Sequence, residues 1–188
     1  MKILLILFAI ICGSSNGYLY WEDIDQEIQN KVIDNPEINR DIKNLYLGKI
    51  SLSDDDKSLL ILENLSSLPE NDTIRAFYFE VFNRQCRLAD GAVAESLSDF
   101  CYKLVKESPC YTLEYFKRDK AIMNLFASMI GETLYFAKKV DDYSSILDER
   151  ILSLKSFQEY IIFSCDNMDE EIRASFFDLL QASINNMN

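Results

Sequence analysis

Residues 72–88 read DTIRAFYFEVFNRQCRL, and this segment decides the fold of the chain. Aromatic or β-branched residues occupy positions 77, 78, 79, 81 and 82, so a helix over the segment has almost no polar face. A helix that is apolar nearly all round is expected to be buried between other helices. The segment therefore predicts a central helix with further helices packed on more than one side.

The chain on both sides of this segment is also helical in its periodicity. Apolar residues predict helices over 21–34, from Pro36 past Tyr46, from Ser53 to Pro69, and over 92–107, 111–117, 120–138, 143–154, 156–165 and 169–186. Pro36 is expected at the first position of its helix, and Ser53 at the N-cap of the next. The low content of 5 Gly and 3 Pro argues against a β-rich fold with many tight turns. We predict one all-α domain over residues 18–188, with antiparallel helix pairs stacked as an α-α superhelix or packed as an irregular helical bundle.

The N-terminus has the three-part layout of a secretory signal. Lys2 supplies a positive charge, residues 3–12 (ILLILFAIIC) form an apolar run, and residues 13–17 are small and polar. The run is shorter than the roughly 20 apolar residues that span a bilayer as a helix. We therefore expect residues 1–17 to be a signal peptide and the mature protein to be periplasmic or extracellular. The alternative of a lipoprotein anchored at Cys12 is weaker, because a small residue should precede that cysteine and Ile11 does so.

Four cysteines follow the signal segment: Cys86, Cys101, Cys110 and Cys165. An even number in an exported chain suggests two disulfides, and four cysteines allow three connectivities. The short spacing makes a local bridge between Cys101 and Cys110 plausible. The alternative is that the cysteines are small buried apolar residues, and this is the preferred interpretation for Cys86 with Cys165.

One internal similarity stands out. Residues 74–82 read IRAFYFEVF and residues 172–180 read IRASFFDLL, with four of nine positions identical, and each follows an acidic turn. Weaker echoes at Ile28 and Ile122 give steps of 46, 48 and 50 residues between successive Ile positions. The acidic turn followed by Ile-Arg-Ala is similar to the start of the second helix of a HEAT repeat.

The HEAT resemblance implies a stack of helix pairs with an extended groove, as in binding scaffolds. It also implies that Arg75 and Arg173 tie neighbouring loops together by hydrogen bonds to turn carboxylates or carbonyls. The alternative is that the matched helices share only a start signal, since acid, Ile, Arg and Ala are ordinary first-turn residues.

Candidate chemistry is sparse. The chain has no His, which excludes Ser-His-Asp and Cys-His nucleophile systems and any His-containing zinc site. The acid clusters at 54–56, 141–142 and 166–171 lack the ligand order of a calcium-binding EF-hand, and each precedes an apolar helical run. Helix capping explains them, so we expect no cofactor, no metal and no enzymatic activity. A carboxylate-dependent hydrolase is the enzymatic alternative, because acids are abundant.

Charge bears on the partners. The chain has 19 basic and 31 acidic residues, for a net charge of −12, and loss of Lys2 with the signal segment gives −13. Such a domain repels phosphate backbones and anionic lipid surfaces, so neither nucleic acid nor a membrane is an expected partner. The sequence thus predicts an exported, non-enzymatic domain that binds another protein, one with a basic surface. The alternative within this class is an immunity-type inhibitor of a secreted toxin, steered onto a basic enzyme by its acidity.

Overall fold

A computed structural model describes residues 18–139 and 152–187, and this part of the chain is helical without strands. Within these two described ranges, a short 3-10 helix, η1, is followed by nine α-helices. Their bounds are η1 Trp21–Asp23, α1 Gln26–Asp34, α2 Arg40–Tyr46, α3 Asp56–Ser66, α4 Asp72–Leu88, α5 Gly91–Glu107, α6 Pro109–Phe116, α7 Lys120–Lys139, α8 Leu154–Ser164 and α9 Glu170–Asn186. The predicted all-α class is confirmed.

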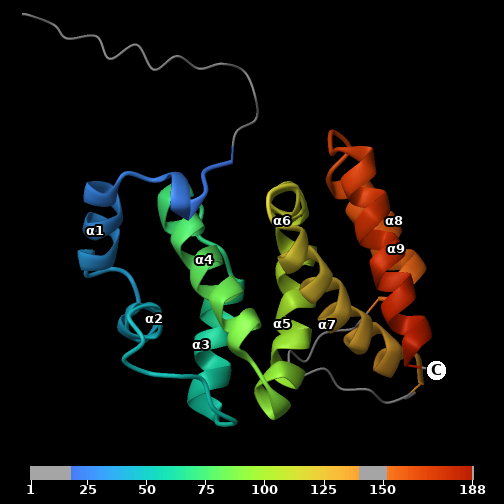
Figure 1. The fold of residues 1–188 in the computed structure, drawn as a ribbon, viewed down its shortest axis with the longest axis horizontal. Coiled ribbons are helices and arrows are strands. Elements are labelled where there is room, and N and C mark those ends of the chain that lie inside the picture. The colour runs from blue at the N-terminus through green and yellow to red at the C-terminus, as the bar shows by residue number, and fades with distance from the viewer. Residues whose placement is uncertain (1–17, 140–151, 188) are drawn as a thin grey trace, which may run out of the picture.

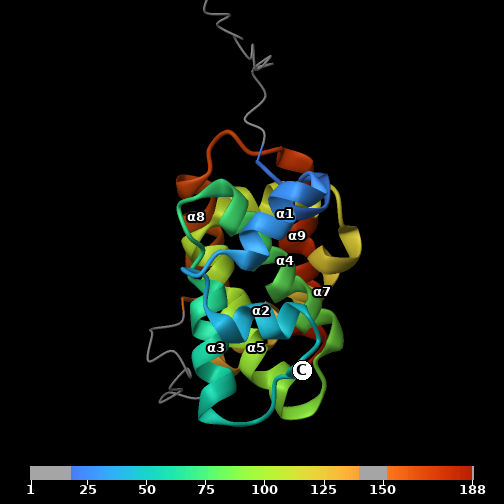
Figure 2. The same ribbon diagram turned by 90° about the vertical axis from the view of Figure 1, so that its left-hand side faces the viewer.

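The main helices lie in two layers (Figure 1). Helices within one layer run in the same direction, and those of the other layer run in the opposite direction. One layer holds α4, α7 and α9, in which α7 packs against both of the others. The other layer holds α3, α5 and α8, in which α5 packs against both of the others (Figure 2). Helices α1 and α2 cover one end of these layers by packing on α4, and α6 bridges the layers by contacting α5, α7, α8 and α9.

Helix α4 has the bounds and the burial that its sequence predicts. Phe77, Phe79 and Phe82 are fully buried. The ring of Trp21 in η1 lies 4.9 Å from that of Phe77, and the ring of Phe126 in α7 lies 5.9 Å from that of Phe82. Both sides of α4 are thus covered by aromatic contacts, which explains why this segment has no polar face.

The three helices of one layer begin in the same way. Asn71, Asp119 and Asp169 are the residues that cap α4, α7 and α9. Their side-chain oxygens accept hydrogen bonds from the backbone amides of Ile74, Ile122 and Ile172 at 3.0, 2.9 and 3.4 Å, respectively. Each cap satisfies an amide that has no partner within its own helix. The internal sequence similarity therefore marks equivalent helix starts in one layer.

The helix predicted over 21–34 is divided, since η1 ends at Asp23 and α1 begins at Gln26 after its cap Asp25. Two further predicted helix starts are wrong. Pro36 lies in a turn, because the Asn35 side chain accepts a hydrogen bond from the amide of Glu37 at 2.9 Å, and the next helix begins only at Arg40. Ser53 is not a cap either. The Asp55 carboxylate caps α3 by accepting from the amide of Ser58 at 2.7 Å.

The helix predicted over 143–154 falls largely outside the described residues, and α8 begins at its last position, Leu154. The signal segment 1–17, with Cys12, also lies outside them. Among the helices that the structure describes, none has both the length and the apolarity needed to cross a membrane.

Candidate functional site

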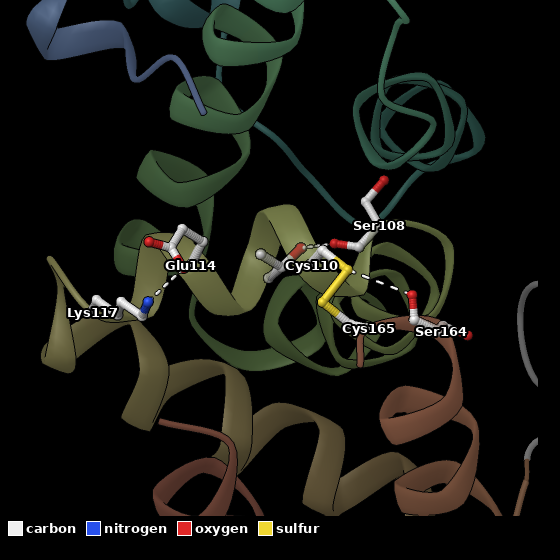
Figure 3. The surroundings of a disulfide bond; sticks show 7 residues. Ser108, Cys110, Glu114, Lys117, Ser164 and Cys165 are labelled. Carbon is white, nitrogen blue, oxygen red and sulfur yellow. Dashed lines mark hydrogen bonds and ion pairs between the residues drawn. A yellow bond between two sulfur atoms is a disulfide. The ribbon is translucent and has the colours of Figure 1, made fainter. Parts of the chain in front are cut away.

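A disulfide joins Cys110 in α6 to Cys165 at the C-cap of α8 (Figure 3). The two Cα atoms are 5.4 Å apart, and 55 positions separate the residues in the sequence. Pro109 occupies the first position of α6, where its missing amide costs no hydrogen bond, and so places Cys110 in the first turn. The bridge fastens the end of α8 to the start of α6.

The predicted pairing of Cys101 with Cys110 is wrong. Cys101 lies in the interior of α5, fully buried, with its Sγ atom 3.7 Å from that of Cys86 and 3.6 Å from the Sδ atom of Met129. Cys110 lies beyond the end of that helix, on the side facing α8. Sequence spacing misses this arrangement because it does not report which face of α5 carries residue 101.

Helix α8 has few buried side chains of its own. Phe157 and Ile161 are its two buried residues. The Phe157 ring stacks on that of Tyr102 in α5 at 5.0 Å, and the Tyr102 hydroxyl accepts a hydrogen bond from the amide of Leu152 at 3.0 Å. With only two buried side chains, α8 packs weakly against the hydrophobic core. The Cys110–Cys165 disulfide therefore supplies much of the attachment of α8 to the rest of the fold.

Three apolar side chains are exposed on α8, beside the exposed ion pair of Lys155 with Glu159. Phe163 is 89% exposed, and Tyr160 and Ile162 are 38% and 43% exposed. Tyr160 and Phe163 are one turn apart and share a face. We call these three side chains the α8 apolar face. Contiguous exposed aromatic and aliphatic side chains mark interaction sites more often than a single exposed residue does.

A pocket of about 390 Å³ opens beside the disulfide and continues from this face. We call it the disulfide pocket. Its lining comes from the α3–α4 turn, the junction of α5 with α6, the end of α8 and the start of the described chain: Tyr18, Leu68, Pro69, Glu70, Arg75, Glu107, Ser108, Pro109, Cys110, Tyr111, Tyr160 and Ser164. Tyr160 belongs to both features, so the α8 apolar face and the disulfide pocket form one continuous surface.

Arg75 is the basic residue of the pocket, and it faces its own turn. Its guanidinium donates hydrogen bonds to the carbonyls of Pro69 and Glu70 at 3.0 and 2.6 Å and pairs with Asp72 at 3.0 Å. It also lies 5.7 Å from the centre of the Tyr111 ring in α6. Arg75 thus binds the turn that precedes its own helix, and a role in joining neighbouring repeats stays a prediction.

Arg173 makes a weaker contact. It pairs with Glu170 one turn earlier on α9, at 3.7 Å. Asp169, the cap of the same helix, pairs instead with Lys117, the C-cap residue of α6, at 3.6 Å, and Lys117 also binds Glu114 at 2.7 Å. The tie between α6 and the turn before α9 therefore comes from Lys117, which sequence reasoning missed, and the structure does not bring Arg75 and Arg173 together in one site.

The first described residues close one side of the pocket. The Tyr18 ring packs edge-on against that of Tyr111 at 5.3 Å, and the Tyr111 hydroxyl donates to the carbonyl of Leu19 at 3.1 Å. Burial raises the pKa of the Tyr111 phenol, which stays a neutral donor. The chain is therefore part of the fold from Tyr18 onward.

The acidic residues of the lining are Glu70 and Glu107, and its one basic residue, Arg75, pairs with Asp72. These two carboxylates are where the hydrolase alternative would have to find its acid and base. In the part of the chain that the structure describes, no three acidic or cysteine side chains gather as a metal site would require. The caps made by Asp55 and Asp169 show that members of two acid clusters bind helix amides, while residues 141–142 lie outside the description.

No protein-family model, curated protein or solved structure matches this chain. The α8 apolar face and the disulfide pocket are therefore the features from which we infer a function.

Proposed function

We propose that this chain is an exported, non-enzymatic helical domain that binds another protein through the α8 apolar face and the disulfide pocket. The exposure of Phe163 carries the proposal. A phenylalanine that is 89% exposed costs free energy in water unless a partner covers it. Phe163 also lies one helical turn from Tyr160, a second exposed aromatic residue, which lines the disulfide pocket.

The Cys110–Cys165 disulfide supports export. Disulfides persist in oxidising compartments and are rare where glutathione keeps thiols reduced. Cleavage after Gly17 would leave the mature chain starting at Tyr18, the residue whose ring packs on Tyr111. Removal of the signal segment is thus compatible with every contact of the described fold.

The disulfide also supports the binding role by fixing the position of α8. A docking surface binds more tightly when its anchors are held in place before the encounter, since less conformational entropy is then lost on binding. Helix α8 buries only Phe157 and Ile161, so the bridge at Cys165 provides the rigidity that its own packing does not.

The proposed partner presents an apolar side chain for the pocket and basic groups for its rim. Glu70 and Glu107 line the pocket, and the net charge of −12 extends the same sign over the molecule. Complementary charge accelerates encounter and selects partners, while the apolar contact supplies most of the affinity.

The repeat-like architecture is part of the proposal. We interpret α3 with α4 and α5 with α7, which pack on each other, as successive HEAT-like helix pairs, with α8 and α9 in the corresponding positions of the next unit. Support comes from the shared caps of α4, α7 and α9, which lie in one layer and begin at equivalent positions. Arrays of this kind present extended binding surfaces to other proteins.

A site-specific crosslinking experiment tests the binding role. A photoreactive phenylalanine analogue is placed at Phe163 and, as a matched control, at Leu88, an exposed apolar residue of α4. Extract from the exported fraction should yield a discrete crosslinked protein from position 163 and none from position 88. The identified partner is then purified, and Phe163→Asp should weaken its binding at least tenfold, whereas Leu88→Asp should not. Equal crosslinking at both positions, or full affinity of Phe163→Asp, would contradict the proposal.

The acidic residues that line the disulfide pocket favour the inhibitor alternative. One measurement distinguishes an inhibitor from a passive scaffold. If the partner is a basic enzyme, its activity should fall as it is titrated with this protein, and Glu70→Gln together with Glu107→Gln should slow association. A partner without enzymatic activity, or one whose activity is unchanged, leaves the scaffold role.

A further inference from the structure

The buried cysteines Cys86 and Cys101 form a close pair away from the proposed binding surface. Cys86 lies in the last turn of α4 and Cys101 in the middle of α5. Their side chains are 2% and 0% exposed, and their Sγ atoms are 3.7 Å apart, which is van der Waals contact. Both residues are thiols in this structure.

We propose that Cys86 and Cys101 form a second disulfide in the mature protein. The proposal rests on export, which supplies the oxidising compartment. Each of the three connectivities has two disulfides, but only one of them contains the Cys110–Cys165 bridge, and its second pair is the one that the fold brings into contact. The chain would then carry one bridge between α4 and α5 and another between α6 and α8.

The geometry requires only a local adjustment. A disulfide has an S–S distance of about 2.05 Å, so the two sulfurs must approach by about 1.7 Å. Helices α4 and α5 are consecutive, joined by Ala89 and Asp90, and both sulfurs lie on buried faces. Rotation about the Cα–Cβ bonds, with a small shift of the flexible Met129 side chain that touches Cys101, is the movement that the proposal requires.

The chemistry is thiol–disulfide exchange with an external disulfide, the class of oxidant that also forms the Cys110–Cys165 bridge. One cysteine thiolate attacks the oxidant and forms a mixed disulfide, after losing its proton to solvent. The thiolate of the second cysteine then attacks the sulfur of the first cysteine in the mixed disulfide. This step forms the Cys86–Cys101 bond and releases the oxidant, which takes up two protons from solvent and leaves as a dithiol. Two electrons pass to the oxidant, and two protons leave the cysteines.

The reaction belongs to folding and not to the folded state. Burial and the neighbouring Cys86 raise the pKa of Cys101, which keeps it protonated and unreactive once the core has closed. The two residues are 15 positions apart, so the loop between them closes at small entropic cost in the unfolded chain. Once formed, the bond is shielded from reductants, because both sulfurs are buried.

Alkylation followed by mass spectrometry tests the proposal. The protein is secreted through its own leader, denatured without reductant in the presence of N-ethylmaleimide, and digested. We expect no adduct on any of the four cysteines and a crosslinked peptide pair that contains Cys86 and Cys101. Adducts on Cys86 and Cys101 with an intact Cys110–Cys165 bridge would overturn the proposal.

A second arm separates this outcome from a failure of export. Fully reduced, unfolded protein is refolded in a glutathione redox buffer and analysed in the same way. Pairing of Cys86 with Cys101 in the refolded protein supports the proposal. Four free thiols in the protein from cells would contradict export and not the pairing. The variant Cys110→Ser/Cys165→Ser contains no other cysteine after residue 17, so its refolding reports the pair alone. Two adducts after refolding of either protein overturn the proposal.

Discussion

Gly131 in α7 lies directly against Ser183 in α9. A Cβ atom at Gly131 would come within 2.5 Å of the Ser183 Oγ atom and 2.7 Å of its Cβ atom. The Ser183 hydroxyl is held there by a hydrogen bond to the carbonyl of Ser128 at 3.2 Å. The absence of a side chain at residue 131 thus sets how closely α7 and α9 approach each other.

Gly131→Ala should therefore destabilise the protein, although Ala is ordinarily the better helix former. The intrinsic gain of up to about 1 kcal/mol is outweighed by an overpacking cost of about 1–3 kcal/mol. We expect the free energy of unfolding, measured in urea, to fall by about 1–2 kcal/mol. Asn124→Ala, on the exposed face of the same helix, is the control. A second change, Ser183→Gly, should recover part of the loss, and a stabilising Gly131→Ala would show that the helices are not in this contact.

The sequence predicts elements better than it predicts their faces. The segment 72–88 identifies its own helix, because an apolar surface all round has one explanation, namely burial on several sides. Cys101 shows the limit, since a spacing of nine residues from Cys110 says nothing about the helix end that intervenes. The Cys110–Cys165 bridge joins residues 55 positions apart and becomes visible only when α6 and α8 are placed.

The proposed binding surface is only partly visible in the sequence. The Ile-Arg-Ala motif draws attention to Arg75 as a contact between repeats, and the structure places this residue in the lining of the disulfide pocket. The exposure of Phe163 could not be derived, because the segment SFQEYIIF is apolar enough to suggest burial and only the scarcity of neighbours around α8 leaves its outer face uncovered. That difference between apolar pattern and actual burial is what makes this helix informative about function.

Asn83 is fully buried in α4, and among the described residues neither its side-chain oxygen nor its nitrogen has a hydrogen-bond partner. A buried amide without partners costs about 1–3 kcal/mol. Asn83→Leu, which has a similar volume, should therefore raise the free energy of unfolding by about 1 kcal/mol or more. Urea unfolding measures the change, and Asn64→Leu on the exposed side of α3 is the control. A loss of stability would show that the amide has a structural or binding role.

The Cys110–Cys165 bridge should stabilise the whole fold and α8 above all. A loop of this length contributes about 4 kcal/mol in the chain-entropy model. The variant Cys110→Ala/Cys165→Ala should lose a comparable free energy of unfolding, and hydrogen exchange should show amides of α8 opening before those of α5. Tyr160→Ala keeps the bridge and serves as the control for changes on the same helix. Unchanged protection of α8 would mean that Phe157 and Ile161 suffice to hold it.

Asp23 and Arg118 link the start of the described chain to the α6–α7 turn, and their pairing should make stability depend on pH. Two hydrogen bonds from the guanidinium, one of 3.1 Å, hold the pKa of the Asp23 carboxyl below its ordinary value. A carboxyl whose pKa is lower in the folded state contributes stability above its unfolded pKa of about 4 and loses it as the pH falls through the folded value. Asp23→Asn should thus lower the urea midpoint at neutral pH, by a modest amount because both side chains are partly exposed.

Near the acid limit, where the native Asp23 carboxyl is itself protonated, the urea midpoints of the two proteins should converge. Asp25→Asn serves as a neighbouring control for the loss of charge, and a deficit of Asp23→Asn that persisted unchanged into acid would show that the carboxylate charge is not what joins these segments.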